Sequence, residues 1–308
     1  MGDRRDTRRQ PPPTGTAART CPRTDVPTAE GSRSVSLHPT LQPYADAWTH
    51  SIEAISELVT PLVEGEWNRR TPCPGWSVRD VVSHVIGLDC EMLGDPRPIH
   101  TLPRDLFHVT NDHQRYMEMQ VDVRRHHTAP EMTSELEYTI IRRNRQLRNE
   151  SRDPGTKVRG PLGAELTLEE AMRTHAFAVW AHEQDLRAAL GRPGNLDSPG
   201  ALVARDVLLG RLPEVMATKV EAPRSSAIVL DVHGPVEFLR TIRIDIQGRG
   251  TLETAPALGP AASLTLDWET FVRLACGRVT PEAVADRVKT EGDPDLTAAI
   301  LKNFTVTQ

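Results

Sequence analysis

The sequence predicts a helical bundle followed by a smaller α+β domain, and two features of its 308 residues indicate this fold. Between about residues 41 and 190, apolar residues recur at three- and four-residue spacing, which is typical of amphipathic helices. After about residue 225 come short segments rich in Val, Ile and Thr, which are typical of strands. We therefore expect a bundle over 39–205 and an α+β domain over 206–308, preceded by an extension over 1–38.

The extension over residues 1–38 is expected to stay unfolded. It holds paired arginines and the run Pro11–Pro13 but almost no large apolar residue, so nothing offsets the entropy of ordering it. No apolar stretch follows the arginines, which excludes a secretory signal. A basic interaction arm and a plain unstructured extension are both open, and the composition favours the extension.

The first two helices of the bundle are expected on either side of a proline-rich loop. An apolar stripe runs from Leu41 to Leu62, and the loop over 72–75 follows it. Ser77-Val-Arg-Asp80 is typical of a capping box, in which the serine oxygen caps free backbone amides. Asp80 also places a negative charge at the positive end of the helix. The second helix is therefore expected to begin after Ser77.

The other two long helices are expected later in the chain, after a stretch with little apolar periodicity. Residues 92–127 show little periodicity and predict a long loop with one short helix. Thr128-Ala-Pro-Glu131 then predicts the start of a helix that reaches Leu147. Thr167-Leu-Glu-Glu170 predicts the start of another, which ends at Leu190 before a Gly-Arg-Pro-Gly turn.

The second domain is predicted to separate its strands from its helices along the chain. A connecting helix is expected near residues 199–211. Strands are expected over 227–232, 239–246 and 262–266. Helices are expected after them, over 268–276, 281–286 and 294–302.

Composition excludes several classes of protein. The formal charge is -5, from 37 basic and 42 acidic residues, which argues against a nucleic-acid partner. No stretch approaches the ~20 apolar residues of a membrane-spanning helix, so no membrane partner is expected. The four cysteines are far apart and form no C-x-x-C, which predicts no disulfide scaffold and a reducing cytoplasm. The preference for arginine over lysine is typical of GC-rich, actinobacterial coding sequence.

Two histidines lie inside predicted helices and are candidate metal ligands. His84 borders the apolar face of the second helix, and His182 lies on the apolar stripe of the fourth. Facing helices of a bundle can build a metal site, and imidazole suits zinc. The alternative is a pair of hydrogen-bonded core histidines, which spacing alone favours. His175 is two turns, about 10 Å, from His182, too far to share one ion easily.

Both histidines lie in distinctive stretches of sequence. These are Thr71-Pro-Cys-Pro-Gly-Trp76-Ser-Val-Arg-Asp-Val-Val-Ser-His84 and Ala178-Val-Trp-Ala-His182-Glu-Gln-Asp-Leu-Arg187. The two stretches resemble the start and the second motif of the mycothiol-dependent maleylpyruvate isomerase family, whose bundle is of the DinB-like, metal-binding kind. Leu274-Ala-Cys-Gly-Arg278 and Glu291-Gly-Asp293 resemble the family's sterol-carrier-like C-terminal domain. The resemblance covers roughly residues 40–308.

The resemblance implies a divalent metal, usually zinc, and predicts its ligands. The family holds the metal with one histidine of the second helix and a Glu/Asp-x-x-x-His pair of the fourth. His84 and His182 match two of these positions, but the carboxylate position is Ala178 here. Asp185 lies one turn beyond His182 and could substitute for the missing carboxylate. Its alternative role is to bind an indole or an arginine such as Arg187.

The resemblance also implies an activity, a mycothiol-dependent isomerase or S-transferase acting on a small, maleylpyruvate-like electrophile. Mycothiol would be the thiol cosubstrate, and the metal would lower the pKa of its thiol. Arg278 and Arg273 are candidate catalytic residues that would stabilise the developing enolate. Cys73 has no evident base beside it in the sequence and is interpreted as structural.

A non-catalytic protein is the alternative hypothesis. Such a protein would have kept the fold, lost the metal and bound a small apolar or thiol-bearing ligand. Ala178 at the carboxylate position favours it. The expected partners are a small-molecule substrate and a low-molecular-weight thiol. A nucleic-acid or membrane-surface partner for the basic extension is disfavoured, because the folded part is net acidic.

Overall fold

Three helices of the bundle begin at the capping residues expected from the sequence, Ser77, Thr128 and Thr167. In the computed structural model, which describes residues 37–307, Ser77 Oγ accepts a hydrogen bond from the Asp80 amide at 3.3 Å, and Asp80 Oδ2 accepts one from the Ser77 amide at 2.8 Å. Thr167 and Glu170 pair in the same way. The predicted helix starts are therefore confirmed. The expectation for the N-terminal extension lies outside the described residues, apart from its last two positions.

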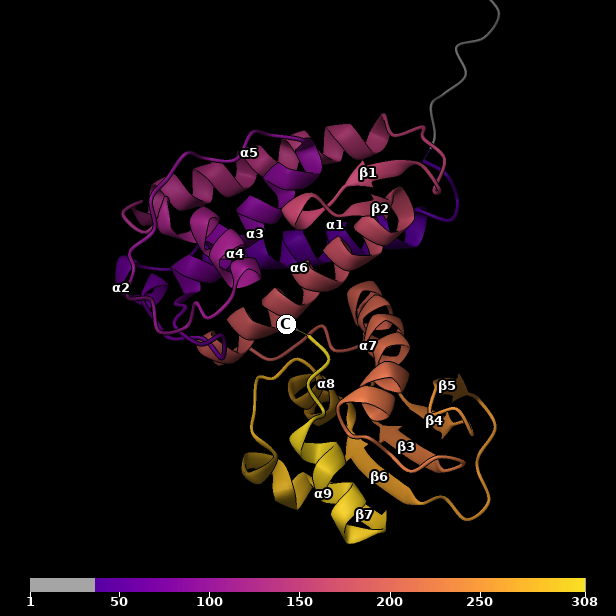
Figure 1. The fold of residues 1–308 in the computed structure, drawn as a ribbon. Helices are drawn as coiled ribbons and strands as arrows, with labels where there is room; N and C mark the ends of the chain where they lie inside the picture. The colour runs from indigo at the N-terminus through magenta and orange to yellow at the C-terminus, as the bar shows by residue number, and fades with distance from the viewer. Residues whose placement is uncertain (1–36, 308) are drawn as a thin grey trace, which may run out of the picture. The chain divides into compact units, whose positions relative to one another are not determined.

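Four long helices form the predicted bundle (Figure 1). α1 and α6 pack together, α3 packs against α5 and α6, and α1 also contacts α5. The bounds of these helices are α1 (Gln42–Val59), α3 (Val78–Leu93), α5 (Ala129–Arg148) and α6 (Leu168–Leu190). Shorter elements lie between them: α2 (Glu64–Trp67), α4 (Asp112–Asp122), and the antiparallel pair β1 (Lys157–Arg159) and β2 (Glu165–Thr167) around the 3-10 turn η1 (Pro161–Gly163).

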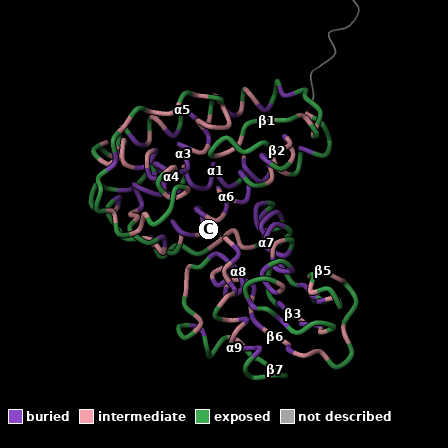
Figure 2. The backbone as a smooth tube through the Cα atoms, viewed as in Figure 1, coloured by how far each residue is buried: buried purple, intermediate pink, exposed green. Residues whose placement is uncertain are grey.

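The apolar stripes of the bundle meet in its interior. Figure 2 shows buried residues on the facing sides of α1, α3 and α6 and along α7, with exposed residues on the outer loops. Trp48, Ile52, Ile86 and Trp180 are almost completely buried there. Burying one large apolar side chain contributes about 1.5–3 kcal/mol, so these contacts stabilise the helices that carry the site.

Helix α7 (Pro199–Thr218) contacts both the bundle and the second half of the chain. It packs against α1 and α6 and also against β4 and β5. The predicted end near residue 211 was wrong, because the helix continues through Pro213. An internal proline costs about 3 kcal/mol, but Leu212 and Met216 on either side of it are completely buried and offset that cost. The predicted domain boundary after residue 205 lies inside this helix and stays a prediction.

The second half contains a five-stranded sheet with the order β5-β4-β3-β6-β7. The three predicted strands are present as β3 (Ala227–His233), β4 (Phe238–Ile244) and β6 (Ala262–Asp267). β3 is antiparallel to β4 and parallel to β6. The edge strands β5 (Gly250–Glu253) and β7 (Val288–Gly292) were not predicted. They are largely exposed, so they lack the alternation of buried and exposed residues that identifies a strand in sequence.

Helices α8 (Trp268–Ala275) and α9 (Pro294–Lys302) contact the sheet, with the 3-10 segment η2 (Pro281–Arg287) between them, close to the predicted positions. Trp268 and Phe271 stack with ring centroids 5.7 Å apart, and Phe238 and Phe304 meet Phe271 edge-on. The predicted fold class, a helical bundle followed by an α+β region, is confirmed. Within residues 37–307, no helix is both long and apolar enough to cross a bilayer.

Candidate functional site

The two predicted histidines meet inside the bundle. His84 on α3 and His182 on α6 have ring centroids 4.8 Å apart, with their ring planes nearly perpendicular at 83°. Both are buried, with exposed fractions of 6% and 8%. The contact follows from the packing of α3 against α6, since both side chains lie on the buried faces of their helices. Burial, followed by the proximity of His182, lowers the pKa of His84 well below its usual value, so its imidazole is neutral.

Asp185 lies one turn beyond His182 and connects it to the second half of the chain. His182 Nδ1 lies 3.0 Å from Asp185 Oδ2. Arg278 donates to the same carboxylate through Nε (2.8 Å to Oδ1) and Nη2 (3.0 Å to Oδ2). Asp185 therefore binds an arginine, which is one of its expected alternative roles, but that arginine is Arg278 rather than Arg187. Arg187 instead donates to Glu183 at 2.7 Å, because the i, i+4 spacing places those two residues on another face of α6.

The Asp185–Arg278 ion pair sets the charge of the site. Burial alone would raise the pKa of Asp185, but the Arg278 charge and the His182 hydrogen bond outweigh burial and hold that pKa well below its usual range. Burial alone would lower the pKa of Arg278, and the Asp185 charge outweighs it in the opposite direction. Asp185 is therefore an anion whose charge is already balanced by a bidentate guanidinium.

Cys73 also belongs to this cluster, although its sequence context predicts only a structural role. Its Sγ lies 3.0 Å from Asp185 Oδ2 and 4.0 Å from His182 Nδ1. Burial, followed by the Asp185 charge, raises the pKa of the Cys73 thiol well above its usual range, so Sγ–H stays protonated and donates to Asp185. The only signal in the sequence is the position of Cys73 in the loop just before the capping Ser77, which ties it to the start of α3.

Ligand atoms from Cys73, His182 and Asp185 lie within 4.8 Å of one another, all from buried residues. A thiol, an imidazole and a carboxylate are the donor types that zinc takes in proteins. His84 adds a second, neutral imidazole beside His182. The donor chemistry therefore fits a divalent metal, on two conditions: Cys73 must lose its proton, and Asp185 must share its oxygens with Arg278. Ala178 contributes no ligand atom at the position expected to carry the carboxylate.

Arg278 and Arg273, the predicted catalytic residues, line one cavity of about 170 Å³. Asp185, Cys276 and Val272 also line it, and most of its wall is apolar. Arg278 uses three N–H groups, two toward Asp185 and Nη1 toward the Cys276 carbonyl at 3.0 Å. A guanidinium has five N–H donors, so about two remain for a ligand. Arg273 lies on α8 and pairs with Glu269 at 3.6 Å.

His175 lies in a separate polar cluster, as its distance along α6 predicts. Its Nε2 lies 2.8 Å from Asp89 Oδ1, and Trp48 Nε1 donates to the same oxygen at 2.8 Å. Asp89 is completely buried. Because both groups are committed to Asp89, this cluster acts as a hydrogen-bonded anchor between α1, α3 and α6.

Comparisons with known protein families cover most of the chain. Residues 48–187 match the mycothiol maleylpyruvate isomerase N-terminal domain. Residues 203–299 match the C-terminal domain of the same family. The comparison with curated proteins gave no match.

Two solved structures with TM-scores above 0.5 share the fold of this chain. A histidine-to-alanine mutant of the mycothiol-dependent maleylpyruvate isomerase is 14% identical, with a TM-score of 0.53, covering 82% of this chain and 93% of that chain. The unmutated mycothiol-dependent maleylpyruvate isomerase is 15% identical, with a TM-score of 0.52 and the same coverage of both chains. Sterol carrier protein domain 2 of Helicoverpa armigera covers 30% of this chain and 78% of its own, at 19% identity and a TM-score of 0.26.

Proposed function

Because the chain belongs to the mycothiol-dependent maleylpyruvate isomerase family, we propose that it is a thiol-dependent isomerase or S-transferase acting on a small electrophile. The observation that carries this proposal is the buried cluster of His84, His182, Cys73 and Asp185 beside a cavity lined by Arg278. A helical bundle that only needed a core would not bury four such polar groups together. Mycothiol is the proposed thiol, and a maleylpyruvate-like compound the proposed electrophile.

A divalent metal, which we propose to be zinc, would be held by His182 and His84 together with Cys73 or Asp185. When bound, it would lower the pKa of a thiol and so make a nucleophile available at neutral pH. The neutral state of His84 supports this role, since a protonated imidazole has no lone pair for a metal. The hydrogen bond between His182 Nδ1 and Asp185 supports a fixed orientation of the His182 ring.

Arg278 is proposed to stabilise the negative charge that develops on the substrate. Arg278 lines the cavity, and Asp185 holds its guanidinium in place through two hydrogen bonds. A pre-oriented donor costs no reorganisation when charge develops on a substrate oxygen. Arg273 on the same wall is proposed to attract a carboxylate of the substrate, since its pairing with Glu269 at 3.6 Å is loose.

A non-catalytic binding protein is the second candidate, and two observations favour it. Ala178 offers no carboxylate, and the charge of Asp185 is already balanced by Arg278. Such a protein would use the apolar cavity to hold a small ligand without a metal.

Replacing His84 separates the two candidates. If the protein is an enzyme, His84→Ala should abolish thiol-dependent consumption of maleylpyruvate-like substrates and reduce zinc binding, whereas His126→Ala, at an exposed position, should change neither. If it is a binding protein, His84→Ala should leave the ligand-induced thermal shift intact. Turnover that persists in His84→Ala would exclude the proposed site.

The domain boundary and the compartment are also proposals. We propose a boundary at residues 205–206. The two family matches, which cover 48–187 and 203–299, support a division between residues 187 and 203, just before the proposed boundary. The free thiols of Cys73, Cys90 and Cys276 support a reducing cytoplasm.

A further inference from the structure

His84 and His182 differ in what fixes the orientation of their rings. His182 Nδ1 faces the Asp185 carboxylate at 3.0 Å. Within residues 37–307, neither ring nitrogen of His84 has a hydrogen-bond partner. Functional histidines are normally oriented by a second hydrogen bond. The orientation of the His84 ring must therefore be fixed by packing, whereas the orientation of the His182 ring is fixed by its contact with Asp185.

The packing partner of His84 is the indole of Trp76. The two ring centroids lie 4.9 Å apart at an interplanar angle of 43°, and the indole also reaches within 6.2 Å of the His182 ring. The backbone of Trp76 is fixed by Thr71, which donates to the Trp76 carbonyl through its amide (3.0 Å) and its hydroxyl (2.9 Å). The direction of the indole is fixed by a separate bond, from Nε1 to Glu118 Oε2 at 2.9 Å.

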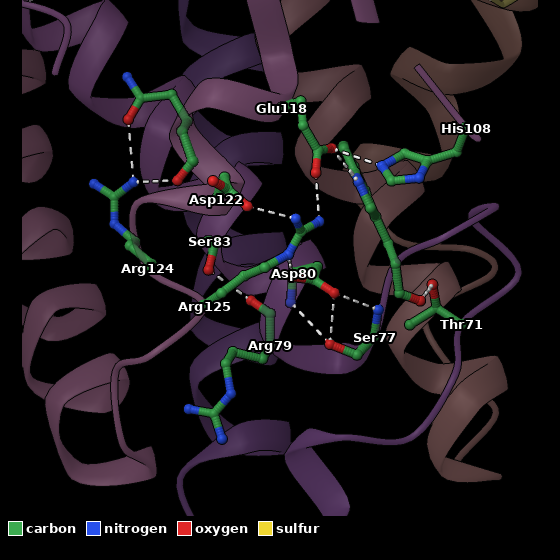
Figure 3. Close-up of polar contacts among 12 residues, drawn as sticks. Thr71, Ser77, Arg79, Asp80, Ser83, His108, Glu118, Asp122, Arg124 and Arg125 are labelled. Carbon is green, nitrogen blue, oxygen red and sulfur yellow. Dashed lines mark hydrogen bonds and ion pairs between the residues drawn. The ribbon is translucent and has the colours of Figure 1, made fainter. Parts of the chain in front are cut away.

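Glu118 on α4 is completely buried, and three donors converge on it. Besides Trp76, His108 Nε2 lies 2.9 Å from Oε2, and Arg125 Nη2 donates to Oε1. Figure 3 shows Glu118 between His108 and Arg125, with Arg125 also reaching Asp122. A buried carboxylate with three donors is held rigidly and can hold their side chains in turn.

The position of Glu118 depends on the close approach of α3 and α4. A Cβ on Gly87 of α3 would lie 2.6 Å from Gln120 Cβ on α4, so only glycine permits this spacing. His84 lies one turn before Gly87, and Glu118 lies two residues before Gln120. The helix that carries His84 is thus packed directly against the helix that orients the indole covering it.

We propose that Glu118 is a positioning residue, which fixes the His84 ring beside His182 through the indole of Trp76. Glu118 hydrogen-bonds neither His84 nor His182, so its effect on them passes through the Nε1–Oε2 bond. The consequence for activity rests on the proposed function, whereas the effect on the ring does not.

The test compares two neutral replacements of Glu118 in the full-length, metal-free protein. Glu118→Leu and Glu118→Gln both lose the negative charge and the ion pair with Arg125. Only glutamine keeps an oxygen that can accept from Trp76 Nε1. The nearby indole shifts the ring-proton NMR signals of His84. Glu118→Leu should move or broaden those signals, and Glu118→Gln should restore them to near their wild-type positions.

Two further variants complete the test. Glu135→Leu removes another glutamate that pairs with an arginine, Arg124, and should leave the His84 signals unchanged. Trp76→Phe removes the indole N–H while Glu118 keeps its other two partners, so it tests the same bond if Glu118→Leu does not fold. Because Trp76→Phe also removes the indole that shifts the His84 signals, its readout is the affinity for zinc, which should fall. The positioning role is overturned if the His84 signals respond equally to Leu and Gln at position 118, if they do not respond to Glu118→Leu, or if Trp76→Phe binds zinc as tightly as the wild type.

The second readout is affinity for zinc, measured by competition with a chelator. Loss of a residue that orients a ligand typically lowers metal affinity about 10–100-fold, so we expect a loss of this size in Glu118→Leu and little change in Glu118→Gln. If the wild type shows no thiol-dependent turnover while the His84 signals respond as expected, the proposed function fails and the positioning role stands. If turnover is present but the signals do not respond, the positioning role alone fails.

Discussion

Arg278 donates two hydrogen bonds to the carboxylate of Asp185, at 2.8 Å and 3.0 Å, across 93 positions of sequence. The pair joins α6 of the bundle to the loop that follows α8. Asp185 is only 3% exposed and also contacts His182 and Cys73. One ion pair therefore both holds the two halves of the chain together and sets the charge beside the histidines.

Breaking this ion pair from one side should strongly destabilise the protein. Arg278→Met leaves the Asp185 carboxylate buried without its counter-charge, which costs about 3–5 kcal/mol of unfolding free energy. Arg273→Met is the matched control, because its partner Glu269 is 46% exposed and such pairs contribute at most about 1 kcal/mol. Urea unfolding measures both variants. Adding Asp185→Asn to Arg278→Met should recover part of the loss, and equal losses in Arg278→Met and Arg273→Met would contradict the prediction.

Restoring a carboxylate at position 178 should strengthen zinc binding. Ala178 lies one turn before His182, so a glutamate there would share its helix face. Ala178→Glu should raise zinc affinity at least about tenfold, which corresponds to 1.4 kcal/mol. Ala178→Gln, of the same size but uncharged, should give a much smaller gain. Titration calorimetry measures the affinities, and an equal response to Glu and Gln would show that position 178 does not face the metal.

The buried, neutral His84 should make the stability of the metal-free protein depend on pH. The pKa of His84 is lowered in the folded state, while the unfolded value is about 6.5, so the unfolded state binds the extra proton first. Its contribution is therefore fully present above pH 6.5 and is lost as pH falls toward the folded pKa, by up to about 1.4 kcal/mol per pH unit. Between pH 7.5 and 5, His84→Gln should lose less stability than the wild type. Parallel curves for the two proteins would be evidence against a buried, neutral His84.

Removing residues 1–36 should leave thermal stability unchanged. The sequence of this segment contains almost no large apolar residue, so its removal should cost no buried surface. The truncation keeps Leu37, which packs against the core. Differential scanning calorimetry should give the same Tm for both forms within error, and a clear decrease would show that the segment packs on the folded part.

The bundle and its helix starts follow from local features of the sequence. The apolar spacing before Leu190 and the caps at Ser77, Thr128 and Thr167 predict α1, α3, α5 and α6 because a helix depends on residues three or four positions apart. The edge strands β5 and β7 were not predicted, because an exposed strand shows no alternation of apolar residues and forms only by pairing with another strand.

The site also has parts that the sequence predicts and parts that only the tertiary structure determines. Its histidines, His84 and His182, and its Arg278 were predicted from their motifs, and the fourth helix presents Asp185 one turn beyond His182. Only the tertiary structure brought Cys73 to Asp185, paired Asp185 with Arg278 rather than Arg187, and placed Trp76 between Glu118 and His84. The contacts of Cys73 and Arg278 with Asp185, and of Trp76 with Glu118, join segments far apart in the chain. The geometry of these contacts depends on how the helices pack and on which charges must be neutralised once they are buried. No local pattern in the sequence predicts either of these.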